Sequence, residues 1–300
     1  MAGAVWEMEY ETLRVERVGS GVLHVEMTRP ASLNAMNKTF FAEVDALFGA
    51  LAGGHVSETQ WVRAVVVSGA GRMFSAGLDL KQAASGAFRP QMGDGDEDED
   101  DGDGAEEDVG RVGVRTVREI VVPWQRAFTR VAECPVPVIG AIHGGCIGGG
   151  VDLACACDIR LAAEDAWFAV AEVQIGIVAD LGTLQRLPRV VGSASLVREL
   201  AFTGRKMGAE EALRVGLVSG LHPDKEGVVA AALEMAARIA ALSPLVVAGT
   251  KDVINFSERV SVEEGLRYVA TFNALATQSS DVVTSVIAQM SKKPALFSNL

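Results

Sequence analysis

The first part of the chain alternates between strand-like and helix-like hydrophobic patterns. Residues 13–18 and 22–27 place apolar side chains at close to alternate positions on either side of a Gly-Ser-Gly turn, which predicts a β-hairpin. Residues 37–51 place apolar side chains at helical spacing, and residues 64–68 form a short apolar run that is typical of a buried strand. This order of elements predicts a mixed α/β fold.

A glycine cluster follows a second buried strand in the middle of the chain. The apolar run 136–142 predicts this strand, and an amphipathic pattern over residues 114–132 predicts a long helix before it that is bent or interrupted at Pro123. Residues 151–157 have the small side chains of a closely packed helix. Between the strand and this helix lie five glycines: Gly144, Gly145, Gly148, Gly149 and Gly150.

Helical patterns dominate the second half of the chain. They cover residues 184–191, 195–202, 209–215, 227–242, 245–254, 262–276 and 281–289. Leu217 and Val218, which follow Gly216, favour a short strand between two of these helices. We therefore expect an α/β core over residues 1–242 and a helical region over residues 243–300.

The acidic charge of the chain is concentrated in one segment. The 300 residues carry a formal net charge of −12 and are 49% hydrophobic, which is enough to bury a full core. Eleven acidic residues and no basic residue lie in 94–108, so the rest of the chain has a net charge of −1. A nearly neutral body gives no support to nucleic-acid binding. We interpret residues 86–113 as a flexible acidic insertion, because they lack both the apolar content of a core and the pattern of an EF-hand.

The cysteines and the two ends of the chain bear on its compartment. The cysteines lie among apolar residues without the paired spacing of a zinc site, so we expect reduced, buried thiols and no metal. The N-terminal sequence lacks the apolar stretch of a secretory signal, and no apolar run reaches the length of a membrane span. Residues 298–300, Ser-Asn-Leu, differ by one residue from the S-K-L peroxisomal signal. We expect a peroxisome-like organelle, with the mitochondrion or the cytosol as alternatives. The cysteines are Cys134, Cys146, Cys155 and Cys157.

The glycine cluster can act through its main chain. Glycines let N–H groups approach a ligand without a Cβ in the way, and a helix N-terminus adds a positive partial charge. The glycines do not follow the spacing of a nucleotide-binding loop. Tight packing without a ligand is one interpretation. The other is a site for a carbonyl oxygen, with the nearby acids Asp152, Glu172 and Asp180 moving protons.

The chain resembles the crotonase (enoyl-CoA hydratase/isomerase) superfamily over about residues 11–290. The resemblance implies a ClpP-like spiral of β-β-α turns with a C-terminal helical region that assembles homotrimers or homohexamers. It implies a fatty acyl-CoA thioester as the substrate and no cofactor, since CoA is part of the substrate. The segments that carry it are HGGCIGGGVDLACACDIRLAAEDAWFAVAEVQIGIVADLGTLQRLPRVVG, the upstream FSAGLDL and the downstream LAFTGRKMGAEEALRVGLVSGLHP.

In this superfamily two main-chain N–H groups hold the thioester oxygen. By motif position, the resemblance assigns them to Ala76 and Gly149. Losing one such donor costs about 3 kcal/mol of transition-state stabilisation in comparable sites. The resemblance also places the rest of the FSAGLDL loop along the substrate: Gly77, Leu78, Asp79 and Leu80.

Three acids resemble those of the dienoyl-CoA isomerases within the superfamily: Asp152 in GGGVD, Glu172 in AEVQIG and Asp180 in IVAD. The resemblance implies that Asp180 takes a proton from C2 and that Glu172 delivers one to C6, with Asp152 in support. This shifts the double bonds of 3,5-dienoyl-CoA to 2,4-dienoyl-CoA in the β-oxidation of unsaturated fatty acids. From the residues alone, Asp180 could instead cap a helix that begins close after it.

Two other functions remain open. The 2-enoyl-CoA hydratases resemble the same pattern, but they carry Glu at the positions of Asp152 and Glu172 and typically Gly at the position of Asp180. The additional acid here favours proton transfer over water addition. A catalytically silent acyl-CoA-binding protein is the second alternative, and the presence of all three acids argues against it.

Overall fold

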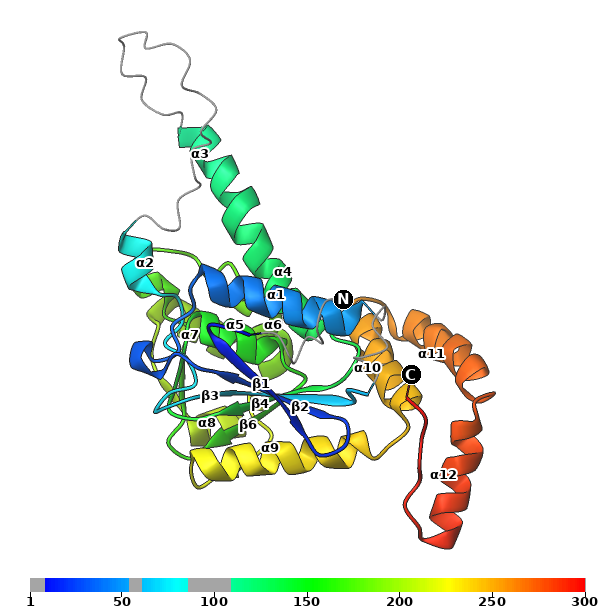
Figure 1. The fold of residues 1–300 in the computed structure, drawn as a ribbon. Helices are drawn as coiled ribbons and strands as arrows, with labels where there is room; N and C mark the ends of the chain where they lie inside the picture. Colours follow the sequence, from blue (N-terminus) through cyan, green and yellow to red (C-terminus); the bar gives the residue numbers. More distant parts are fainter. Residues whose placement is uncertain (1–8, 54–60, 86–108, 300) are drawn as a thin grey trace, which may run out of the picture.

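The computed structural model describes residues 9–53, 61–85 and 109–299. The acidic segment 94–108 and Leu300 lie outside the described residues. The described chain is a mixed α/β body from which the last helices extend on one side (Figure 1). These are α10 (Pro244–Ser257), α11 (Val262–Ala276) and α12 (Ser280–Ser291).

Six strands of the described chain form the main sheet, in the order β1-β2-β3-β4-β6-β9. β1 and β2 form the predicted antiparallel hairpin, and each later pair of neighbours is parallel. Parallel neighbours need crossover connections, so helices cover both faces of the sheet. The strands are β1 (Leu13–Val18), β2 (Val22–Met27), β3 (Ala64–Gly69), β4 (Val138–Ile142), β6 (Ile159–Ala163) and β9 (Leu221–His222).

A second, smaller sheet begins just beyond the carboxyl end of β4. Within the described residues it has the order β5-β7-β8, with β5 at Gly145–Ile147, β7 at Trp167–Ala169 and β8 at Met207–Gly208. These strands have two or three residues each, too few to show a period in the sequence. Strand β5 of this sheet contains Gly145 and leads to the buried glycines Gly148–Gly150 at the start of α5.

Helix α9 (Lys225–Ala240) covers one face of the main sheet and runs along it in Figure 1. Val228, Ala232, Ala236 and Ala240 repeat at intervals of four, so they share one helix face, and all of them are buried against the strands. Small side chains on that face allow the helix backbone to approach the sheet closely.

The opposite face packs against α1 (Lys38–Ala52) and α4 (Val122–Ala132). Helix α1 begins where the side chain of Asn37 accepts a hydrogen bond from the N–H of Phe40, as expected for an N-cap. The rings of Phe41 and Trp124 stack, with centroids 4.3 Å apart and planes within 8°. This contact fixes α1 against α4 beside the predicted site.

The long helix before β4 differs from the sequence-based prediction at its start. It begins at Val109 rather than residue 114, as α3 (Val109–Thr116), so residues 109–113 are not part of a loop. It continues through a π-helical turn, η3 (Val117–Val121), into α4. The predicted interruption is this π-helical turn, which comes just before Pro123. Proline has no N–H to donate to the preceding turn, and its ring needs extra space there, so the regular α-helical hydrogen bonds are broken at this point.

The strand predicted at Leu217 and Val218 is wrong. Both side chains are buried, but the N–H groups of both donate to the carbonyl of Ala212 in helix α8 (Ala209–Arg214), and these bonds close the end of that helix. These two residues are apolar because they are buried in the core, not because they form a strand. The strand in this region is β9, which begins at Leu221. The remaining short helices are η2 (Pro30–Ser32), α2 (Leu80–Ala84), α5 (Gly149–Ala156), η4 (Glu172–Ile175), α6 (Thr183–Val191), α7 (Ala194–Thr203) and α8 (Ala209–Arg214).

Lys251 attaches the C-terminal helices to the body. Its side chain is buried, and Nζ donates to the Asp158 carboxylate at 2.7 Å and to the Val136 carbonyl at 3.1 Å.

Among the described residues, no single helix has both the length and the apolar composition needed to cross a membrane. Helices α9 and α10 meet these criteria only when they are taken together, and a bend of 109° separates them.

Candidate active site

The FSAGLDL loop lies beside the glycine cluster because the two segments pair through their main chains. The N–H of Ser75 donates to the Gly145 carbonyl, and the N–H of Ile147 donates to the Ser75 carbonyl, each at 3.0 Å. Gly77 has φ +80°, and a Cβ added there would lie 2.6 Å from the carbonyl oxygen of Ile147. Glycine is therefore required at position 77 for the loop to approach the N-terminus of α5.

Two main-chain amides are available to a ligand where the loop meets α5. Gly149 is the first residue of α5, so its N–H has no partner within the helix. Within the described chain, the N–H groups of Leu78 and Gly149 donate to no protein acceptor, and both residues line one pocket. The amide of Ala76 instead donates to the carbonyl of Leu33 at 2.9 Å. This corrects the assignment made from the sequence: Leu78, not Ala76, presents the free amide opposite Gly149.

The other residues of the predicted loop have different positions. Leu80 lines the same pocket as Leu78, whereas Asp79 is buried in an ion pair with Arg29 at 3.0 Å. Burial alone would raise the pKa of Asp79, but hydrogen bonds from Arg29 and the Gln82 amide lower it overall. Asp79 thus fixes the loop at the start of α2.

The free amides and all three predicted acids line a pocket of about 170 Å³. Its remaining walls are mainly apolar and come from α1, α4, β5 and the segment after β7. The residues that line it are Phe41, Ala76, Leu78, Leu80, Val121, Trp124, Ile147, Gly148, Gly149, Asp152, Ala171, Glu172, Ile175, Ile177, Asp180 and Leu181. The structure therefore brings the FSAGLDL loop and the three later acids into one pocket.

Asp152 is the most deeply buried of the three acids. It lies in the first turn of α5, and its Oδ1 accepts a hydrogen bond of 2.6 Å from the N–H of Thr183, the first residue of α6. Burial raises its pKa to about 6, and hydrogen bonds from Thr183 oppose this shift. Asp152 therefore connects the start of α5 to the start of α6.

Glu172 is buried at the start of η4, and its Oε2 has no hydrogen-bond partner among the described residues. Burial, and then the charges of Asp152 and Asp180, raise its pKa to about 7. Its Oε1 faces Gly148, where an added Cβ would lie only 3.2 Å away. Gly148, at φ +50°, is a site residue that the sequence-based prediction did not single out, although it belongs to the glycine cluster.

Asp180 lies at the exposed side of the pocket, outside any helix or strand. The walls around it bury it enough to raise its pKa. The capping alternative is wrong, because Gly182 occupies the N-cap position of α6 and Asp152 binds the first helical N–H. The Asp180 carboxyl group is thus not needed to begin the helix.

Comparison with known proteins places this site in a family. The model of the enoyl-CoA hydratase/isomerase family matches residues 17–101 and 111–299. The chain belongs to the enoyl-CoA hydratase/isomerase family. Its fold is the crotonase spiral with a C-terminal helical region, as expected from the sequence.

Relatives in this family match nearly the whole chain. The chain is 47% identical over 291 residues to the mitochondrial Delta(3,5)-Delta(2,4)-dienoyl-CoA isomerase of Homo sapiens, covering 97% of this chain and 83% of the relative. It is 41% identical over 293 residues to the peroxisomal enzyme of the same name from Arabidopsis thaliana, covering 97% and 98%. The crystal structure of an enoyl-CoA hydratase from Bacillus anthracis matches with a TM-score of 0.80 at 26% identity, covering 96% of this chain and 99% of that one.

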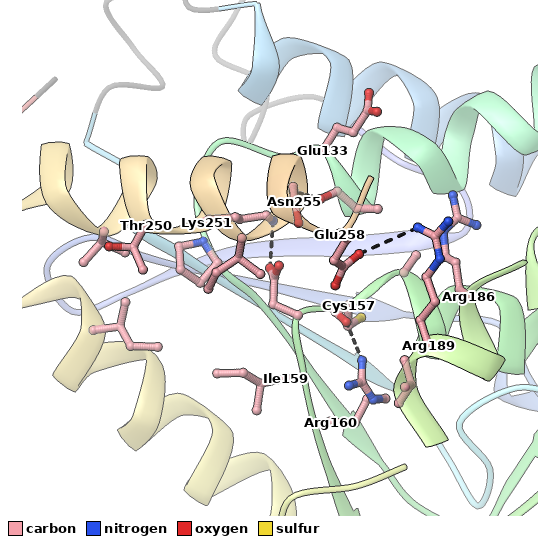
Figure 2. Close-up of a pocket in the computed structure, with 18 of the residues that line it drawn as sticks. Glu133, Cys157, Ile159, Arg160, Arg186, Arg189, Thr250, Lys251, Asn255 and Glu258 are labelled. Atoms are coloured by element: carbon pink, nitrogen blue, oxygen red, sulfur yellow. Dashed lines mark hydrogen bonds and ion pairs between the residues drawn. The ribbon is translucent and has the colours of Figure 1, made fainter. Parts of the chain in front are cut away.

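A larger cavity, of about 840 Å³, lies at the other end of α5 (Figure 2). Two ion pairs lie in its wall: Arg189 with Glu258, and Lys251 with Asp158. Arg160 donates to the carbonyl of Cys157 at the end of α5. These interactions connect α5, α6 and α10, so the charges of this cavity join the elements behind the smaller pocket.

Proposed function

We propose that this chain isomerises 3,5-dienoyl-CoA to 2,4-dienoyl-CoA in the β-oxidation of unsaturated fatty acids. The observation that carries the proposal is the meeting of Glu172 and Asp180 with the free amides of Leu78 and Gly149 in one pocket. The names of the human and plant relatives support the same activity.

The amides of Leu78 and Gly149 hold the thioester oxygen. When C2 loses its proton, negative charge moves to this oxygen, and fixed donors stabilise the charged oxygen more strongly than the neutral one. The N-terminus of α5 contributes positive partial charge at the same place. Proton loss from C2 therefore becomes possible for a carboxylate base.

The two flanking acids divide the proton transfers. Asp180 removes the proton from C2, and the electron pair of that C–H bond moves into a conjugated enolate that extends to C6. Protonated Glu172 then donates to C6, which gives double bonds at C2 and C4. A pKa of about 7 keeps a large fraction of Glu172 protonated at neutral pH, as an acid must be. A proton passes from Asp180 back to Glu172 through solvent before the next turnover.

The assay is the appearance of the 2,4-dienoyl chromophore when purified protein meets 3,5-dienoyl-CoA. A faster loss of enone absorbance with 2-enoyl-CoA would indicate a hydratase instead. Unchanged turnover in Asp180→Asn would contradict the proton-transfer roles. Binding of acyl-CoA without either reaction would indicate a silent binding protein.

No cofactor is part of this proposal, because CoA arrives with the substrate and proton transfer needs no redox partner. Among the described residues, no group of three or more His, Cys, Asp or Glu side chains is placed to hold a metal ion. Addition of a chelator should therefore leave turnover unchanged.

We also propose that the chain has two parts: residues 1–242 form the core, and residues 243–300 form the contacts that assemble a homotrimer or homohexamer. Large apolar side chains on the last helices are exposed in the single chain: Val262 and Met290 are each 81% exposed and Leu275 is 74% exposed. Such surfaces usually mark protein interfaces. Light scattering should give a multiple of three chains, and Met290→Lys with Leu275→Lys should lower the measured mass.

The compartment belongs to the proposal as well. The names of the relatives include mitochondrial and peroxisomal locations, and Ser298-Asn299-Leu300 favours the peroxisome. A fluorescent protein carrying residues 291–300 should enter peroxisomes, and the same fusion with Leu300→Ala should not.

A further inference from the structure

Asp180 needs a fixed position although its surroundings are irregular. It lies in the segment between η4 and α6, where Ile177 and Val178 are exposed, and it is exposed itself. An acid on such a segment would normally sample many positions. The proton transfer proposed above requires one position, about 3 Å from C2 of the substrate.

Three side chains bind the main chain around Asp180 from three helices. Gln125 of α4 donates from Nε2 to the carbonyl of Asp180 at 2.7 Å. Arg186 of α6 donates from Nη1 to the next carbonyl, that of Leu181, at 3.2 Å. Asp152 of α5 accepts the N–H of Thr183. The turn is thus held at three points within four residues.

The guanidinium of Arg186 fits this turn closely. Gly182 has φ +127°, and a Cβ added there would lie 1.9 Å from Nη1 of Arg186. The other end of the guanidinium donates from Nη2 to Oγ1 of Thr129 at 3.2 Å. Thr129 lies four residues after Gln125, on the same face of α4. One face of α4 therefore holds the turn both directly and through Arg186.

We propose that Gln125 and Arg186 are positioning residues for Asp180, which hold its main chain so that its carboxyl group meets C2 of the substrate. This inference rests on the proposed isomerase activity. Neither side chain needs to touch the substrate, since both act through carbonyl groups of the turn. Their loss should therefore slow proton removal without weakening acyl-CoA binding.

Matched variants separate this role from general stability. Gln125 is exposed, so Gln125→Ala removes the hydrogen bond to Asp180 and leaves the packing of α4 intact. Arg186→Lys keeps a donor, whereas Arg186→Gln shortens the side chain. Arg189→Gln is the control for Arg186, because Arg189 lies near it in Figure 2 but pairs with Glu258. Gln185→Ala, at an exposed residue of α6, is the control for Gln125.

The experiment measures kcat and KM on 3,5-dienoyl-CoA, together with the exchange of the C2 proton for deuterium in D₂O. We expect Gln125→Ala and Arg186→Gln to lower kcat and the exchange rate about 10-fold each, with KM within about 2-fold of the unsubstituted chain, because small misplacements of a catalytic group are costly. Arg186→Lys should recover part of the loss, and both controls should match the unsubstituted chain.

The outcomes distinguish this inference from the activity on which it rests. If the unsubstituted chain does not turn over the dienoyl-CoA, the proposed function fails. If it does, but Gln125→Ala and Arg186→Gln keep kcat and C2 exchange within about 2-fold, the positioning role is refuted. Equal losses in the two control variants would also refute it, since they would show a general effect of changing α6.

Discussion

Replacing Glu172 by glutamine should stabilise the folded protein above neutral pH while it abolishes isomerisation. The Glu172 side chain is buried, and its Oε2 has no partner among the described residues. Burial, followed by the charges of Asp152 and Asp180, raises its pKa from 4.5 to about 7. Glutamine keeps the shape of the side chain but never ionises. The substitution therefore removes the cost of a buried charge together with the proton donor.

The magnitude follows from the shift in pKa. At about 1.4 kcal/mol for each unit, the difference between 4.5 and about 7 corresponds to about 3 kcal/mol. Between these two values the folded protein binds more protons at Glu172 than the unfolded chain does, so stability falls as the pH rises through this window. The cost is absent below the unfolded value and complete above the folded one. Relative to the unsubstituted chain, the variant should gain about 2 kcal/mol between about pH 5 and about pH 8.

Urea unfolding at several pH values, at one protein concentration, measures this gain. A constant offset from the new amide group does not affect the result, because only the change with pH is compared. Glu210→Gln is the matched control, since Glu210 is an exposed glutamate on α8 and its replacement should give no comparable trend. A difference between Glu172→Gln and the unsubstituted chain that stays flat across this range would refute the argument that Glu172 is held protonated by burial.

Three further substitutions test the site. Asp180→Asn should lower kcat at least about 100-fold with little change in KM, measured by formation of the 2,4-dienoyl chromophore, because the base is lost while binding remains. Gly148→Ala should lower both kcat and the melting temperature, since φ +50° disfavours a side chain and the new Cβ would lie 3.2 Å from Oε1 of Glu172. Asp152→Ala should be about 1 to 2 kcal/mol less stable in urea unfolding than Asp152→Asn, because both variants lose the charge but only alanine removes the acceptor of the first N–H of α6; equal midpoints for the two variants would contradict that role.

The sequence predicted the elements that have a clear period and a recognisable boundary. Helix α1 has apolar residues at helical spacing, and the structure places it at Lys38–Ala52 with Asn37 as its N-cap. The buried strands β3 and β4 were equally clear, because neither face of a central parallel strand meets water. The small strands β5, β7 and β8 were missed, since two or three residues carry no pattern.

The proposed oxyanion donor shows what a local motif does not determine. Both Ala76 and Leu78 belong to the FSAGLDL loop, and motif position assigned the donor to Ala76. The direction of each amide depends on a distant segment, because Leu33 provides the carbonyl that the Ala76 amide binds. The flanking bonds join Met36 to Gly77 and Asp79 and leave Leu78 between them. That pairing is tertiary, so a motif read along the chain could not reveal it.

The two ends of α5 explain why this helix can serve the reaction. At its C-terminus, buried Arg160 donates to the carbonyls of Ala154 and Cys157, so the negative end of the helix is neutralised by a fixed cation. At its N-terminus, the amide of Gly149 faces a pocket without a protein acceptor in the described chain. An acid in the first turn of a helix would normally balance the positive partial charge of its N-terminus, but the carboxyl group of Asp152 accepts the N–H of Thr183 instead. The described part of the protein therefore supplies no negative charge to the positive end of α5. In the proposed reaction, the enolate of the acyl-CoA supplies that charge, and only while the proton is being transferred.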